Sequence, residues 1–277
     1  MRVVVTGTGP GSIGLATAEA LAAAGHEVLT STRSTRTPGF AWHALDLADR
    51  ASVADFAAWV ADQGPLDVLV NNAGVHLDLR NHWKQPELLD GEEVHWRTNY
   101  LGTVQLTRAL LPALLERADE TGDVRVVHVV SKLHARGRND AFFSEFGDRY
   151  NSWDAYGTSK LGLVHDAASL AELHGQRGLR AYAVHPGAVA TGISGRGMES
   201  SPVLKRLHAV AAPLERLVLK SPQTGARTSV HCATSAQATS GYYDNVRPKA
   251  PASQAGDLAA RAELLARTET WLTGSGA

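Results

Sequence analysis

The fold of this chain is indicated by its first fourteen residues, which read MRVVVTGTGPGSIG (residues 1–14). Residues 2–6 are a short β-branched run, which predicts a strand. A glycine-rich turn follows, and residues 13–24 then predict a helix that ends at Gly25. Glycines let a phosphate approach closely, and a helix N-terminus supplies free N–H groups. The stretch therefore predicts a pyrophosphate-binding loop. A glycine-rich turn without a ligand is the alternative, because G-x-G-x-x-G read from Gly9 is weak alone.

The rest of the chain alternates between expected strands and helices. We expect strands at residues 27–31, 41–45, 67–70, 124–130 and 179–185, and helices at residues 51–62, 92–115 and 155–172. Nearly continuous apolar strands separated by helices are typical of a parallel sheet that is covered on both faces. The predicted fold class is α/β, a single-domain Rossmann-type doubly wound parallel sheet with helices on both faces, over residues 1–277.

Two segments break this alternation, and loops of such length inside a compact domain are usually lids or binding loops. We expect substrate loops at residues 133–153 and 192–222, the second with a helical pattern at residues 203–219. The first contains a group of aromatic residues, which suggests an apolar or aromatic ligand. The alternative is a surface excursion that packs its own aromatics, namely Phe142, Phe143, Phe146, Tyr150 and Trp153.

Composition excludes several classes of protein. The net charge is −1, which gives no sign of a nucleic-acid or membrane-surface partner. Cys232 is the single cysteine, so the chain forms no internal disulfide. The chain contains no charged leader with an apolar core and no apolar run near ~18 residues. Twelve histidines are present, but none lies in a compact metal-ligand motif. We expect a soluble, cytoplasmic protein without a metal.

Residues 156–160, YGTSK, place a phenol and an ammonium four positions apart in an expected helix, so that both lie on one face. A free phenol titrates near pH ~10. A lysine cation held against it favours the phenolate and lowers its pKa. The pair can therefore exchange a proton with a carbonyl or alcohol oxygen. A surface tyrosine and lysine are the alternative, and a redox cofactor elsewhere in the chain would decide between the two.

The ordered landmarks together resemble the short-chain dehydrogenase/reductase family over essentially the full length. Within it, the chain is most similar to the retinol-dehydrogenase and WW-domain-oxidoreductase-like branch. The glycine-rich loop is one residue longer than the family pattern. The other landmarks are Asp46-Leu47, NNAG at 71–74, Asn99 in TNYLG at 98–102, Ser131 after an apolar strand, Tyr156 with Lys160, and HPGAVAT at 185–191.

The resemblance implies four catalytic residues. Tyr156 would be the general acid in reduction and the general base in oxidation, and Lys160 would lower its pKa and bind the nicotinamide ribose. Ser131 would hold the substrate oxygen. Asn99 would lie at a helix kink whose backbone carbonyl binds a proton-relay water; the alternative is a side-chain bond to residue i−4 without a function.

The resemblance also implies the cofactor contacts. Loop residues would bind the pyrophosphate, residues after the third and fourth strands would line the nucleotide, and residues after the strand expected at 179–185 would line the nicotinamide. The expected residues are Gly7, Gly11, Ser12, Ile13, Gly14, Arg33, Asp46, Leu47, Asn72, Ala73, Gly74, Tyr156, Lys160, Pro186, Gly187, Val189 and Thr191.

Cofactor choice depends on the end of the second strand, where NAD sites commonly place an Asp or Glu on the ribose 2′-OH. Residues 30–36 read TSTRSTR and contain no carboxylate. Arg33 can bind a 2′-phosphate with its guanidinium, with Ser34 and Arg36 nearby. We therefore expect NADP(H); the alternative is that Arg33 is a solvated surface residue.

The resulting expectation is an NADP(H)-dependent oxidoreductase, such as a carbonyl reductase. It would transfer hydride between the nicotinamide and a carbonyl or alcohol of a small, apolar or aromatic substrate. A catalytically silent dinucleotide-sensing or scaffold protein is the alternative, since fold alone never establishes activity. A sugar-nucleotide epimerase is a third candidate. The family commonly forms homo-oligomers through the helices that carry Asn99 and Tyr156, although some relatives are monomers.

Overall fold

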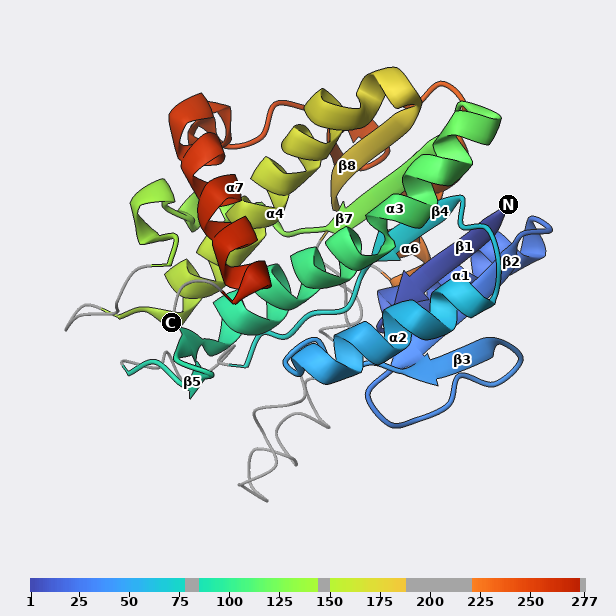
Figure 1. Cartoon of the computed structure of the whole chain (residues 1–277), viewed down its shortest axis with the longest axis horizontal. Helices are drawn as coiled ribbons and strands as arrows, with labels where there is room; N and C mark the ends of the chain where they lie inside the picture. The colour runs from blue at the N-terminus through green and yellow to red at the C-terminus, as the bar shows by residue number, and fades with distance from the viewer. Residues whose placement is uncertain (78–84, 144–149, 188–220, 275–277) are drawn as a thin grey trace.

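The protein is built around one eight-stranded sheet, seen in a computed structural model that describes residues 1–77, 85–143, 150–187 and 221–274 (Figure 1). The strand order is β10-β9-β8-β7-β4-β1-β2-β3. Neighbouring strands are parallel except for β9 and β10. The strands are β1 (Arg2–Thr6), β2 (Glu27–Thr32), β3 (Ala41–Ala44), β4 (Val68–Asn71), β7 (Val124–Val129), β8 (Leu179–His185), β9 (Gly241–Asp244) and β10 (Arg247–Pro248); β5 (Leu88–Leu89) and β6 (Glu92–Glu93) form a separate hairpin.

Helices cover both faces of the sheet. Helices α1 and α6 pack together on one face, and α2, α3, α4 and α7 lie on the other (Figure 1). A π-helix, η1, directly precedes α3. The bounds are α1 (Ile13–Ala23), α2 (Arg50–Asp62), η1 (Trp96–Gly102), α3 (Thr103–Thr121), α4 (Ser152–His174), α6 (Pro222–Thr234) and α7 (Leu258–Thr273), with 3₁₀ turns η2 (Lys132–Arg136), η3 (Asn139–Ala141), η4 (Gly175–Arg177) and η6 (Ser253–Gly256).

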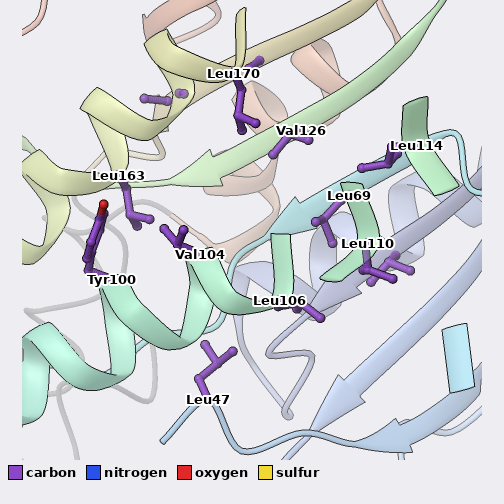
Figure 2. Close-up of a cluster of buried hydrophobic side chains, with 14 of the residues drawn as sticks. Leu47, Leu69, Tyr100, Val104, Leu106, Leu110, Leu114, Val126, Leu163 and Leu170 are labelled. Atoms are coloured by element: carbon purple, nitrogen blue, oxygen red, sulfur yellow. The ribbon is translucent and has the colours of Figure 1, made fainter. Parts of the chain in front are cut away.

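Side-chain alternation along the strands divides the apolar residues between two cores. In β1, Val3 and Val5 belong to the core under α1 and α6, whereas Val4 belongs to the core under α3 and α4. Figure 2 shows this second core, where Leu69 of β4 lies beside Leu110 of α3. Burying a side chain of this size stabilises the fold by roughly 1.5–3 kcal/mol. The strands therefore have to be apolar on both faces, as the sequence predicted.

Helix α7 lies across η1, α3 and α4 (Figure 1). The Tyr100 hydroxyl of η1 is 2.9 Å from the Thr268 hydroxyl, and both residues are buried. The Arg50 guanidinium lies 3.5 Å from the centre of the Trp271 ring and donates to the Trp271 carbonyl at 2.7 Å. A helix that is distant in sequence thus covers the outer side of η1.

The predicted fold class is confirmed. The helix expected at residues 92–115 is present, but residues 92–93 form β6, residues 96–102 are a π-helix, and α3 extends to Thr121. Asp90 and Gly91 have φ of 53° and 81°, so the chain reverses there and forms the β5–β6 hairpin. The π-helix follows, and α3 runs on to Gly122, which ends it in the left-handed conformation. Helix α6 was not assigned from the sequence, and the helical pattern at residues 203–219 lies outside the described residues.

Candidate active site

The glycine-rich turn after β1 is locked to the loop after β4. The Asn72 amide donates to the carbonyls of Thr6 and Gly7 at 2.9 and 3.2 Å. A Cβ on Gly14 would lie 2.4 Å from the Asn72 amide nitrogen and 2.5 Å from the Gly7 oxygen. A Cβ on Gly7 would lie 2.8 Å from Ala73 Cα, and Gly7 has φ of +74°. Glycine is therefore required at both positions by packing.

The start of α1 fits a pyrophosphate. The Ser12 hydroxyl caps the helix by accepting from the Leu15 N–H at 3.0 Å. The N–H groups of Ile13 and Gly14 lie in the first turn, where a helix supplies no backbone acceptor. Gly11 has φ of +69°, and a Cβ there would meet nothing within 4 Å. This donor set and the open space beside it suit an anionic group of a dinucleotide.

The described ones among the remaining predicted cofactor residues follow the carboxyl ends of neighbouring strands. Arg33 follows β2 and is exposed. The side chain of Leu47 is buried in the core (Figure 2), and its carbonyl accepts from Arg97 at 3.0 Å, so the Leu47 side chain does not face a nucleotide. The Asp46 carboxylate accepts from the Ala48 N–H at 2.9 Å. Pro186 and Gly187 follow β8, whereas Val189 and Thr191 lie outside the described residues.

Tyr156 and Lys160 lie on α4 as predicted, with the Lys160 ammonium 5.7 Å from the centre of the phenol ring. The ammonium donates to the Val129 carbonyl at 3.2 Å. Burial lowers the pKa of Lys160 to about 8. Burial also raises the pKa of Tyr156 to about 12, against the opposing effect of a hydrogen bond with Ser131. The sequence predicted that Lys160 lowers the phenol pKa, whereas burial and Ser131 determine it here.

Ser131 and Asn99 join the pair from two other elements. Ser131 caps η2 and accepts from the Leu133 N–H at 3.2 Å. Asn99 lies in the π-helix, consistent with the predicted kink, and its amide bonds both backbone groups of Val75 at 2.7 and 2.9 Å rather than its own helix. A Cβ on Gly74 would lie 3.1 Å from Asn99 Oδ1 and 3.2 Å from Lys160 Nζ. Gly74, Asn99 and Lys160 therefore converge.

Sequence reasoning did not assign a group of buried histidines around these residues. The His134 ring approaches the Ser131 carbonyl at 2.7 Å through Nδ1 and accepts from the Ala252 N–H at 3.0 Å through Nε2. These two bonds fix a neutral ring, and burial lowers the pKa of His134 accordingly. The His76 ring lies 4.1 Å from that of Tyr156, nearly parallel. No sequence motif marks either contact.

The aromatic segment expected to line the substrate loop packs largely into the core. Phe142 is buried and stacks on Trp96, with ring centres 5.5 Å apart, and Phe143 meets the edge of the same ring at 5.2 Å. The Tyr150 hydroxyl donates to buried Glu93 at 2.8 Å. Phe142, Phe143 and Tyr150 therefore pack against the protein itself, whereas Trp153 lies beside His76 near Tyr156. Residues 144–149 lie outside the described residues, and the substrate loop stays a prediction.

No cluster of three or more His, Cys, Asp or Glu side chains in the part of the chain that the structure describes could hold a metal ion. Within the same residues, no helix has both the length and the apolar character needed to cross a bilayer.

Comparison with known proteins agrees with this geometry. A family model described as short chain dehydrogenase matches residues 1–200. The chain belongs to the short-chain dehydrogenase family. Retinol dehydrogenase 12 of Mus musculus is 34% identical, with 83% of this chain and 72% of the relative covered. Dehydrogenase/reductase SDR family member 13 of Bos taurus is 36% identical, with 83% and 61% covered.

A solved short-chain dehydrogenase/reductase family protein superposes with a TM-score of 0.59 at 27% identity, covering 88% of this chain and 96% of that one. These relatives place the chain in the retinol-dehydrogenase-like branch, and they support an oxidoreductase that uses a nicotinamide dinucleotide.

Proposed function

We propose that the protein is an NADP(H)-dependent oxidoreductase. It transfers hydride between the nicotinamide and a carbonyl or alcohol group of a small, apolar or aromatic molecule. The observation that carries the proposal is the convergence of Ser131, Tyr156, Lys160 and Asn99 from three elements. The retinol dehydrogenases among the relatives support an apolar alcohol or aldehyde as substrate. A cytoplasmic location and homo-oligomerisation stay predictions.

The chain supplies the proton and the positions in this proposal, while the bound dinucleotide supplies the hydride acceptor or donor. Tyr156 donates a proton to the substrate oxygen in reduction, and Ser131 holds that oxygen and stabilises its developing charge. With its pKa raised to about 12, the Tyr156 phenol carries its proton at neutral pH. Lys160 would bind the nicotinamide ribose, and the backbone carbonyl of Asn99 would bind a proton-relay water.

NADP(H) is proposed over NAD(H) because of the charge at the end of β2. Arg33 is exposed directly after Thr32, and no carboxylate stands at residues 30–36. Within the described residues, Arg33 forms no ion pair or hydrogen bond that would occupy its guanidinium. A planar guanidinium suits the bidentate binding of a 2′-phosphate.

A screen of NADPH oxidation against aldehydes, ketones and quinones tests the proposal. We expect Tyr156→Phe to lower kcat by roughly 10²–10⁴-fold, the usual effect of a positioned acid, and to leave the cofactor Kd unchanged. The control is Tyr182→Phe, which removes a buried hydroxyl that donates to Ala238 at 2.8 Å on the other face of the sheet. A Tyr156→Phe enzyme with most of its kcat would contradict the mechanism. Cofactor binding without turnover of any carbonyl would favour the silent sensor.

A further inference from the structure

The ring of Tyr156 is covered on one face by a histidine from another part of the chain. His76 lies just beyond NNAG at residues 71–74, whereas Tyr156 lies on α4. Their ring centres are 4.1 Å apart and their planes differ by 8°. His76 is 6% exposed. The two rings are therefore stacked face to face in near-parallel planes.

This geometry excludes direct proton exchange between the two side chains. An imidazole nitrogen donates or accepts in the plane of its ring, and a phenol hydroxyl also lies in its ring plane. Two rings that face each other at 4.1 Å direct these groups along parallel planes. His76 therefore acts on Tyr156 through contact with its face.

The stack is held from behind by a buried network of polar side chains. His95 meets both the His76 and the Tyr156 rings edge-on, with centres 5.7 and 6.0 Å away. His95 Nδ1 is 2.7 Å from the Glu93 carboxylate, and His95 Nε2 accepts from the Leu77 N–H at 3.2 Å, next to His76 in the chain. Glu93 and His95 are fully buried.

The Glu93 carboxylate is itself fixed by two further donors. It accepts from the Trp96 N–H and from the Tyr150 hydroxyl, both at 2.8 Å. The edge of Trp153 completes the enclosure of His76, with ring centres 5.0 Å apart. The network reaches from the start of η1 to the ring that covers Tyr156, so buried contacts set the position of His76.

We propose that His76 is a positioning residue for Tyr156: its flat ring fixes the plane of the phenol and hence the position of the reacting hydroxyl. The proposal rests on the proposed function, since positioning matters only where the hydroxyl reacts. A misplacement of 1 Å can lower turnover by about 100-fold. The property that His76 supplies is a flat ring of the right size, rather than a proton or a charge.

Kinetics of two substitutions test this distinction. We expect His76→Ala to lower kcat by about 10–100-fold, with KM and the cofactor Kd little changed. We expect His76→Phe, which keeps a flat ring and removes both nitrogens, to recover most of that loss. His43→Ala is the matched control, because His43 stacks on Trp59 at 5.3 Å at the distant strand β3, and it should leave kcat unchanged.

Two outcomes would overturn the proposal: an unchanged kcat in His76→Ala, or a His76→Phe enzyme as impaired as His76→Ala. If His76→Ala does not fold, His76→Leu replaces it, since leucine fills space without a flat ring. Aromatic NMR of the Tyr156 ring, assigned from the signals missing in Tyr156→Phe, gives a readout that does not need turnover. The ring-current shift should be lost in His76→Ala or His76→Leu and kept in His76→Phe.

This readout separates the two proposals. A wild type that reduces no carbonyl but shows the ring-current shift would refute the proposed function and leave the stack in place. A wild type that is active but shows no shift from His76 would refute the positioning role alone.

Discussion

The nucleotide half and the catalytic half of this site differ in the kind of group that makes their contacts. In the nucleotide half, backbone groups and small residues make the contacts, and Gly7, Gly14 and Asn72 fit with no space for an added atom. In the catalytic half, buried titratable side chains such as Glu93 and Lys160 do so. The first half should therefore be sensitive to added atoms, and the second to the loss of a partner.

The largest effect that we expect in this comparison comes from Asp166, on α4 with Tyr156. Its buried carboxylate lies 2.9 Å from His128 Nε2 and 2.5 Å from Arg108 Nη2. Breaking a buried ion pair by removing one partner costs roughly 3–5 kcal/mol. We expect Asp166→Asn to lower the free energy of unfolding by about that amount, measured by urea denaturation. Asp140→Asn, which breaks an exposed pair with Arg138, should change it by under about 0.5 kcal/mol.

The contribution of the Asp166 carboxylate to the free energy of unfolding should depend on pH. Burial disfavours its charge, but Arg108 and His128 outweigh that effect and lower the pKa of Asp166 from 3.8 to about 2. Its contribution is complete above pH 3.8 and is lost as the pH falls through about 2, because the unfolded state binds the proton first. The deficit of Asp166→Asn should therefore shrink over that window. If the loss of unfolding free energy in Asp166→Asn is the same at every pH, then the shape of the Asp166 side chain, and not its charge, stabilises the fold.

The next prediction tests which cofactor the nucleotide half binds. A hydrogen bond to a charged group contributes about 1.5–3 kcal/mol, or roughly 10–150-fold in affinity. We expect Arg33→Ala to weaken NADPH by that factor and to leave NADH nearly unchanged, as measured by fluorescence titration of both cofactors into both proteins. Equal losses would mean that Arg33 supports the loop instead. A wild type that prefers NADH would refute the NADP(H) assignment.

The smallest expected effect tests whether one added Cβ atom is enough to disrupt the nucleotide half. We expect Gly14→Ala to lower the free energy of unfolding by about 1–3 kcal/mol, because its Cβ would meet Asn72 and the Gly7 carbonyl. Cofactor affinity should fall as well. Gly9→Ala is the matched control in the same loop, since a Cβ there meets nothing within 4 Å. If the two variants have equal melting temperatures, the tight fit around Gly14 is unimportant.

The two halves also differ in how far the sequence predicts them. The glycine-rich turn is a local pattern, although the contacts that require Gly7 and Gly14 come in part from distant Ala73 and Asn72. Four-residue spacing likewise placed Tyr156 and Lys160 on one helix. The stack of His76 on Tyr156 depends on how a loop and a helix face each other after folding, so no local pattern contains it. The helix expected at residues 92–115 starts later than predicted for a local reason, because the left-handed turn at Asp90 and Gly91 places residues 92–93 in the β5–β6 hairpin.

The contacts of α7 have a consequence for how the chain folds. The Tyr100–Thr268 hydrogen bond joins residues 168 positions apart, and the Arg50–Trp271 bond joins residues 221 apart. The entropy lost on closing a loop grows with its length, and high contact order slows folding. The bonds between the nucleotide loop and Asn72 span 66 and 65 positions, whereas the bond that joins the π-helix with Asn99 to α7 spans 168. Catalytic competence should therefore be regained more slowly than α1 on refolding.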